Sequence, residues 1–237
     1  MRTARGSSAR QPEEEEEESD PAGRDAAGRG RTGVLERLLR SGATIAAAVL
    51  APGLWLAWPL FLSGDPSVAA DPAKFVLHHL GFTAAAVLAA TLALTPLRVV
   101  FPRWRAAQVV QRHRRFIGVS AFVYAALHVG MHFIYEGGFA TFRTDWQKPF
   151  IAVGAVAFLI LALLAATSAK PVVRALGARR WKAVHRAVYL AALLVVYHQV
   201  SAKKVFPMEV VWVFGPVLVL EAIRIWRVFA GRTRRAG

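Results

Sequence analysis

The stretch KAVHRAVYLAALLVVYHQVS, residues 182–201, decides the fold of this chain. It is an apolar run of the length that a membrane-spanning helix needs, which is about 20 predominantly apolar residues. One histidine stands near each end, His185 and His198. An ionisable side chain inside hydrocarbon is costly and usually marks a functional site, whereas a single histidine at the end of a span can simply cap backbone groups. This stretch alone leaves both interpretations open.

The spacing of His185 and His198 shows whether they could bind one metal together. They are 13 positions apart, which places them roughly 20 Å apart along a helix axis. They therefore cannot ligate one metal together, and each needs a partner from another helix. Neutral imidazole is a good ligand for haem iron, and the cores of helix bundles often hold such cofactors. The two histidines are thus candidate haem ligands near opposite faces of a bilayer.

The whole chain predicts an all-α fold, a polytopic membrane helical bundle. Of its 237 residues, 55% are hydrophobic, and several apolar runs are long enough to cross a bilayer. About six transmembrane helices are expected, near residues 43–62, 76–96, 116–135, 150–168, 183–201 and 209–226.

Polar tails flank this predicted bundle. Residues 1–40 include a run of glutamates, Glu13 to Glu18, followed by glycine, arginine and alanine residues. Such a segment cannot bury apolar surface, so we expect it to be disordered. It has no apolar core beside a cleavage site, so no signal peptide is predicted. Residues 230–237 are expected to form a basic C-terminal tail, which leaves residues 41–229 as the membrane domain.

The basic residues indicate the orientation of the bundle. Lysine and arginine outnumber the acids by 30 to 15, giving a net charge of +15. They lie in short loops that cannot form a basic groove with stacking aromatics, so no nucleic-acid partner is expected. Two loops contain no acid, and their basic residues are Arg98, Arg103, Arg105, Arg112, Arg114 and Arg115 after the second span and Lys170, Arg174, Arg179, Arg180 and Lys182 after the fourth. The positive-inside rule places both loops and both termini in the cytoplasm.

The residue types and motifs that the sequence lacks limit the cofactors that this chain can bind. The chain has no cysteine, which excludes disulfides, cysteine-ligated iron–sulfur clusters and haem attached through a C-x-x-C-H motif. No P-loop or Rossmann glycine pattern is present, and no soluble segment is long enough to bind NADPH or FAD. A haem in this chain would have to be held by histidine alone.

With this topology, the histidines gather toward the outer half of the bundle. The outer group is His78, His79, His128, His132 and His198, and the inner group is His113 and His185. Arg114 lies 14 positions before His128, close to the same helical face. It is a candidate contact for a haem propionate or a quinone headgroup. It could equally be one more of the arginines that mark the cytoplasmic loops. Three glycines allow either close helix contact or space beside a porphyrin: Gly81, Gly118 and Gly154.

Several blocks of the sequence resemble one family of membrane proteins. They include DPAKFVLHHLGFTAA at residues 71–85, RRFIGVSAFVYAALHVGMHF at 114–133 and LGARRWKAVHRAVYLAALLVVYH at 176–198. In unbroken order they are similar to the MsrQ family, the haem-binding membrane subunits of the periplasmic protein-methionine-sulfoxide reductase system. This family belongs with the ferric reductase-like transmembrane proteins. Residues 41–229 thus resemble a ferric reductase-like haem-binding domain.

The resemblance implies a multi-pass haem b subunit of the bacterial inner membrane. Such a subunit takes electrons from the quinone pool, or through FMN, and passes them to a periplasmic molybdenum-cofactor reductase. That catalytic partner, and not the membrane subunit, reduces methionine sulfoxide in oxidised periplasmic proteins.

Position by position, the resemblance also implies a ligand set. The family's haem histidines fall on His128, His185 and His198, with His78 as a further match. Where related NADPH oxidase domains have a second histidine on the third span, this chain has Arg114, so the resemblance does not complete an inner bis-histidine site unless His113 substitutes. The remaining outer histidines, His79 and His132, match no family ligand.

Matching depth predicts that His128 and His198 share one outer haem. Two other functions stay open on the sequence. A ferric or oxygen reductase would need a separate cytoplasmic flavin reductase as its donor, and a non-redox scaffold or transporter would use the histidines structurally. A dithionite-reducible b-type spectrum distinguishes the two redox functions from the third.

Overall fold

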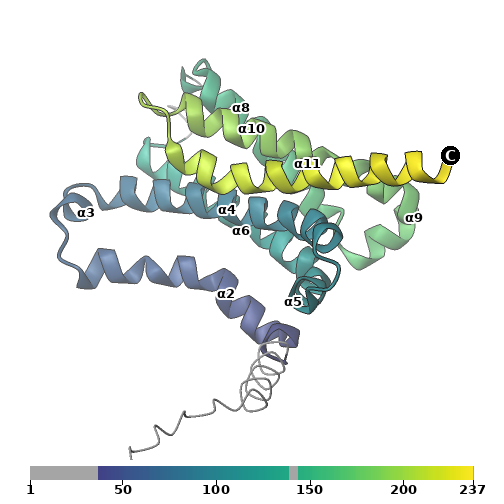
Figure 1. Cartoon of the computed structure of the whole chain (residues 1–237). Helices are drawn as coiled ribbons and strands as arrows, with labels where there is room; N and C mark the ends of the chain where they lie inside the picture. Colours follow the sequence, from purple (N-terminus) through teal and green to yellow (C-terminus); the bar gives the residue numbers. More distant parts are fainter. Residues whose placement is uncertain (1–36, 139–143, 237) are drawn as a thin grey trace, which may run out of the picture. The chain divides into compact units, whose positions relative to one another are not determined.

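The computed structural model describes residues 37–138 and 144–236, and within these residues every regular element is a helix (Figure 1). Five helical stretches are long and apolar enough to cross a membrane: Gly42–Leu62, Pro72–Val100, Arg105–Tyr135, Pro149–Ala166 and Lys170–Ser201. They overlap the first five predicted spans. The expectation of an all-α, multi-pass membrane bundle is therefore confirmed.

The helices follow one another with short connections. Their order is α2 (Gly42–Trp55), η1 (Trp58–Leu62), α3 (Pro66–Ala70), α4 (Pro72–Val100), α5 (Arg105–Val110), η2 (Gln111–His113), α6 (Arg114–Tyr135), α8 (Pro149–Ala166), α9 (Lys170–His185), α10 (Ala187–Ser201) and α11 (Met208–Ala236). Proline begins α3, α4 and α8, because a first helical position needs no N–H donor and suits the fixed φ of proline. The carboxylates of Asp65 and Asp71 cap α3 and α4 by accepting from backbone N–H groups.

The sixth predicted span lies in α11. This helix is 29 residues long, but its apolar part carries Glu221, Arg224 and Arg227, and it is not among the five membrane-length apolar stretches. A sixth crossing therefore stays a prediction. Of the predicted tails, residues 1–36 lie outside the described residues, positions 37–40 are helical, and α11 continues to Ala236.

Helix α4 is the central helix of the bundle. In its most apolar segment 61% of the residues are buried, against 22% or less in the other four stretches. Leu88 and Leu92 of α4 pack in an apolar cluster with residues of α6, α8, α10 and α11. Ala121 of α6 and Ala191 of α10 are completely buried there, and such small residues let membrane helices approach closely.

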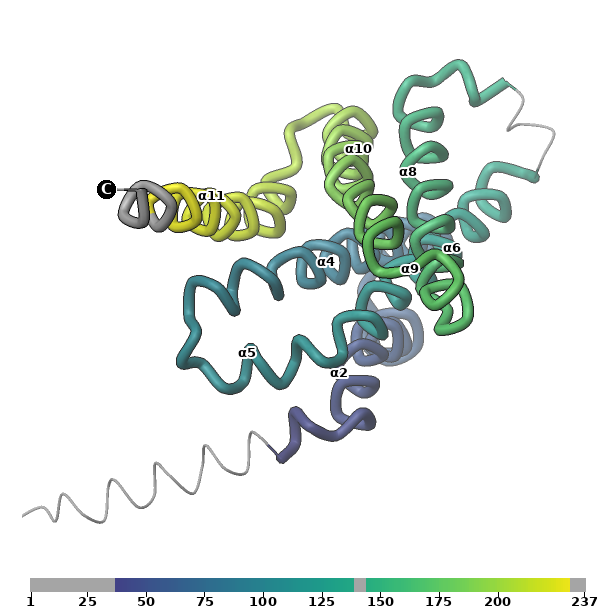
Figure 2. The backbone as a smooth tube through the Cα atoms, turned by 90° about the vertical axis from the view of Figure 1, so that its right-hand side faces the viewer, coloured from purple at the N-terminus to yellow at the C-terminus, as the bar shows by residue number. Residues whose placement is uncertain are grey.

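The other helices pair around α4 in two groups. Helix α4 packs most extensively on α6 and also along α11, while α10 packs on α8 (Figure 1, with a second view in Figure 2). A further contact between α6 and α8 joins the two groups. Helices α6 and α10, which carry the predicted outer ligands, therefore belong to one packed bundle.

Helix α2 is fixed to this bundle by polar contacts. The Tyr124 hydroxyl in α6 donates to the Val49 carbonyl (2.8 Å) and accepts from the Gly53 N–H (3.2 Å). In an uninterrupted α-helix these two backbone groups, at positions i and i+4, pair with each other. The hydroxyl therefore bridges two successive turns of α2. The ring of His79 in α4 adds a second contact, since its Nε2 lies 2.8 Å from the Pro52 carbonyl.

Candidate functional site

The structure brings His128 of α6 and His198 of α10 together. Their ring centres are 6.2 Å apart and their planes are inclined by 79°, so the rings are nearly perpendicular. Both side chains are partly buried. These are the two histidines that the sequence predicts at matching depth on different spans.

His128 is held against α4. Its Nδ1 lies 2.9 Å from the Leu77 carbonyl. Gly81 stands four residues further along α4, and a Cβ at this position would lie only 2.9 Å from the Nδ1 and Cε1 atoms of the ring. Real Cβ atoms essentially never make contacts this short, so the ring can occupy its position only beside glycine.

His198 is held against α8 in the same way. Its Nδ1 lies 2.7 Å from the Phe150 carbonyl. Gly154 stands four residues further along α8, and a Cβ there would lie 2.7 Å from Nδ1 and 2.9 Å from Cε1 of the ring. The sequence leaves open whether these glycines allow close helix contact or make space beside a porphyrin. In the structure, Gly81 and Gly154 make room for the histidine rings. The third, Gly118, faces Thr91, whose Cγ2 would lie 3.4 Å from an added Cβ.

These contacts fix the chemistry of both rings. A carbonyl oxygen only accepts hydrogen bonds, so Nδ1 is the donor on each ring. In a neutral imidazole Nε2 then holds the lone pair that binds a metal, and within the described residues neither Nε2 atom has a hydrogen-bond partner. This is the usual arrangement of a metal-ligating histidine, whose second nitrogen is oriented by a carbonyl.

The distance between the rings also suits a shared metal. A bond from an imidazole nitrogen to a metal is about 2 Å, so two imidazoles on opposite sides of one iron have ring centres about 6 Å apart. The observed separation of 6.2 Å agrees with this value. The residues present therefore fit a haem whose iron His128 and His198 would hold together.

His185, at the end of α9, has different surroundings. Its ring stacks on Trp181 at 4.0 Å between ring centres. Its Nδ1 lies 3.2 Å from the Trp181 carbonyl and its Nε2 lies 3.3 Å from the Ser168 hydroxyl. In the described part of the chain, the structure does not bring a second histidine ring to His185. Ligation of a metal by Nε2 would require release of the Ser168 contact.

The other described histidines make different ring and backbone contacts. His79 stacks on Trp55 and contacts the α2 backbone, which is a structural role. His132 lies against Phe133, and His113 precedes α6 without capping it through its side chain. His78, the further match from the family resemblance, is exposed on α4.

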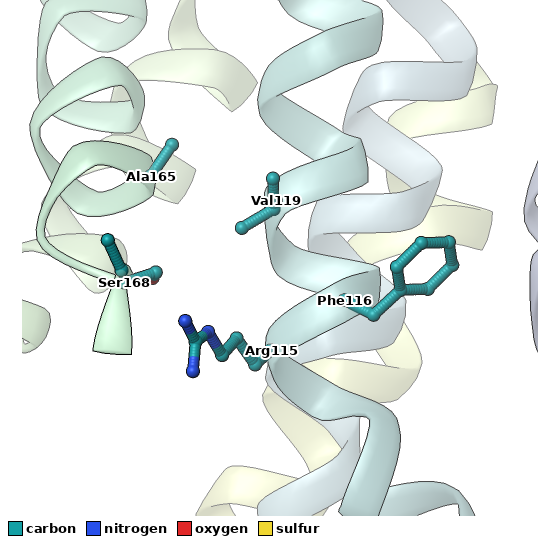
Figure 3. A pocket seen from close by; sticks show the side chains of 6 residues that line it. Arg115, Phe116, Val119, Ala165 and Ser168 are labelled. Atoms are coloured by element: carbon teal, nitrogen blue, oxygen red, sulfur yellow. The ribbon is translucent and has the colours of Figure 1, made fainter. Parts of the chain in front are cut away.

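A cleft of about 410 Å³ lies between the start of α6 and the end of α8 (Figure 3). It is lined by Arg115, Phe116, Val119, Ala165, Ser168 and Ala169. The Arg115 side chain extends toward Ser168 across the cleft (Figure 3), and Ser168 in turn contacts His185. Arg114, which the sequence favours for a headgroup contact, is not among the lining residues.

Comparison with known proteins identifies the family. Residues 80–196 match the family model described as "Ferric reductase like transmembrane component". Three relatives bear the name "Protein-methionine-sulfoxide reductase heme-binding subunit MsrQ". The protein of Xanthomonas axonopodis pv. citri is 35% identical over 196 residues, covering 80% of this chain and 88% of the relative. That of Brucella anthropi is 32% identical over 180 residues (75% and 78%), and that of Cronobacter sakazakii 34% over 183 residues (75% and 87%). The chain therefore belongs to the MsrQ family of ferric reductase-like transmembrane proteins.

Proposed function

We propose that this membrane electron-transfer subunit binds haem b in the outer half of the bundle, where His128 and His198 would hold the haem iron. The observation that carries this proposal is the pair of rings 6.2 Å apart, each with Nδ1 bonded to a carbonyl and Nε2 free to ligate. The relatives' name, which calls them heme-binding subunits, supports the binding of haem. When bound, the haem supplies a one-electron carrier inside the membrane.

We further propose the route of the electrons. They come from the quinone pool of the bacterial inner membrane, with FMN as an additional cofactor, and leave to a periplasmic molybdenum-containing methionine sulfoxide reductase subunit. The relatives' name supports a methionine sulfoxide reductase system as the partner. In a heterodimer of this kind the present chain carries electrons, and the partner reduces methionine sulfoxide in oxidised proteins.

The inner half of the bundle is the proposed point at which electrons are received. His185 is the proposed ligand of an inner haem, with Arg114 and His113 as neighbours at the same depth and His78 assigned to the outer haem surroundings. The cleft between α6 and α8 supports a quinone headgroup near the inner face, because Arg115 and Ser168 offer polar hydrogens beside apolar walls. Its Ser168 also contacts the His185 ring, which links this cleft to the proposed inner ligand.

The assignment of the outer haem is tested by removing each ligand. His128→Ala and His198→Ala should each abolish the low-spin absorbance and EPR signals or remove most of the haem, because an axial position of the iron becomes open. His132→Ala is the matched control, since this histidine lies one turn from His128 on the same helix but outside the pair. It should keep the haem content and spectrum of the unaltered protein.

The reverse pattern would contradict the proposal. Full haem content and a low-spin spectrum in both His128→Ala and His198→Ala would show that the iron has other ligands. Arg114→Ala should leave the outer haem bound and slow only its reduction by quinol, because the arginine lies at the other end of α6.

A further inference from the structure

Two matching structural features hold the rings of His128 and His198. Each consists of a carbonyl that accepts from the histidine Nδ1–H and a glycine four residues later on the same helix, and we call each a glycine notch. In α4 the notch is Leu77 and Gly81, and in α8 it is Phe150 and Gly154. The two notches therefore repeat one geometry on two different helices.

The glycine in each notch has a defined steric role. The Cα–Cβ bonds of a helix point toward its N-terminus, so the side chain of residue i+4 covers the turn that contains the carbonyl of residue i. Glycine at i+4 leaves this carbonyl open to a ring from the neighbouring helix. Added Cβ atoms at Gly81 and Gly154 would lie 2.9 and 2.7 Å from the nearest ring atoms, far inside the usual carbon contact distance of about 3.5–4.0 Å.

We propose that Gly81 and Gly154 are positioning residues of the haem site, which admit the two ligand rings to their carbonyls and thereby set the angle between the rings. This inference rests on the proposed function, because it assigns both rings to one haem. The three atoms nearest to an added Cβ belong to the His128 ring at Gly81 and to the His198 ring at Gly154. Together they maintain the 79° angle between the ring planes.

Displacing a ring changes the electronic properties of the site. A hydrogen bond from Nδ1–H to a carbonyl raises the basicity of the ligating nitrogen and so favours ferric iron. Loss of this bond in Gly81→Ala or Gly154→Ala should raise the reduction potential of the haem. The EPR signal of a low-spin ferric haem depends on the angle between its axial ring planes, so this signal should shift in both variants.

The first experiment measures these two properties in the purified full-length protein with its haem. Gly81→Ala and Gly154→Ala should each show a shifted low-spin EPR signal and a raised reduction potential. Gly130→Ala is the matched control, because Gly130 lies on α6 near His128 but an added Cβ would meet nothing within 4 Å. It should keep the spectrum and the potential of the unaltered protein.

The second experiment tests the steric pairing through thermal unfolding of double variants. His128→Ala and His198→Ala provide two backgrounds in which the haem site is disrupted and one of the two rings is missing. Gly81→Ala should lower the Tm in the His198→Ala background, whereas in the His128→Ala background, where its opposing ring is absent, the Tm should stay the same or rise slightly. Gly154→Ala should show the opposite pattern.

The outcomes separate this inference from the proposed function. Unchanged EPR signals and potentials in both glycine variants, or equal Tm losses in the two backgrounds, would overturn the positioning role while leaving the ligands intact. Full haem content in His128→Ala and His198→Ala would instead contradict the proposed function, and with it the assignment of the notches to a haem. The glycine roles are supported only when the spectral shifts and the crossed Tm pattern are both observed.

Discussion

A buried hydroxyl in α6 helps to fix α2 to the rest of the bundle. Tyr124 is 6% exposed, and its hydroxyl bonds both to the Val49 carbonyl and to the Gly53 N–H. Gly53 makes the approach possible, since a Cβ there would lie 3.0 Å from the hydroxyl oxygen.

We therefore expect Tyr124→Phe to weaken the attachment of α2. The Val49 carbonyl and the Gly53 N–H would each lose their bond to the hydroxyl, which should reduce the free energy of unfolding by about 1–3 kcal/mol. Thermal or denaturant unfolding in detergent measures this loss. Tyr197→Phe is the control, because Tyr197 is half exposed and its hydroxyl has no hydrogen bond within the described residues. Equal stability of the two variants would show that the Tyr124 hydroxyl does not anchor α2.

At the same scale, the site is only partly readable from the sequence. The pairing of His128 with His198 is predictable, because depth in a membrane follows directly from position along a helix. The carbonyl partners are not, since they depend on which helices are neighbours and on how each helix is rotated. Gly81 and Gly154 give a visible signal in the sequence, but two interpretations fit it until the opposing rings are known.

For the helices, the length of each apolar run predicts where a span lies, but it does not predict which helices pack against that span. All six predicted spans are helical, because a chain in lipid must satisfy its backbone hydrogen bonds internally. The central place of α4 is not predictable, since every span is apolar and lipid is as apolar as a neighbouring helix. The fifth predicted span begins at 183, whereas the helical stretch in the structure begins at Lys170.

This longer stretch contains a bend at Gly177. Its backbone has φ 71° and ψ 158°, a conformation that is essentially restricted to glycine. Gly177→Ala should therefore reduce the free energy of unfolding by about 1–3 kcal/mol through backbone strain. Gly130→Ala, a helical position with open space, is again the control and should be neutral or slightly stabilising. Unfolding curves that coincide for the two variants would argue that α9 can straighten without cost.

The orientation of the whole molecule in the membrane is a separate prediction. Both acid-free loops are expected in the cytoplasm, so alkaline phosphatase fused after Arg105 or after Arg174 should be inactive. Fusions after Gly64 and after Gly138, in the alternate connections, should be active. Green fluorescent protein fused at the same positions should show the complementary pattern, which controls for poor expression of any one fusion.

A fusion at the C-terminal end of the chain tests the sixth crossing. The charged residues of α11 leave open whether this helix spans the membrane. Glu221 and Arg224 form an ion pair 2.8 Å long, and Tyr189 of α10 donates to Glu221. Arg227 donates to the Val100 carbonyl at the end of α4. Charges that are paired or bonded to backbone groups are tolerated inside a membrane bundle, so we expect α11 to cross the bilayer. Phosphatase fused after Gly237 should then be inactive. Activity at this position together with inactivity after Arg105 would show that the chain crosses the membrane only five times and that α11 lies on the periplasmic side. Activity after Arg105 would instead invert the whole topology. The inner and outer assignments of all the histidines would then be exchanged.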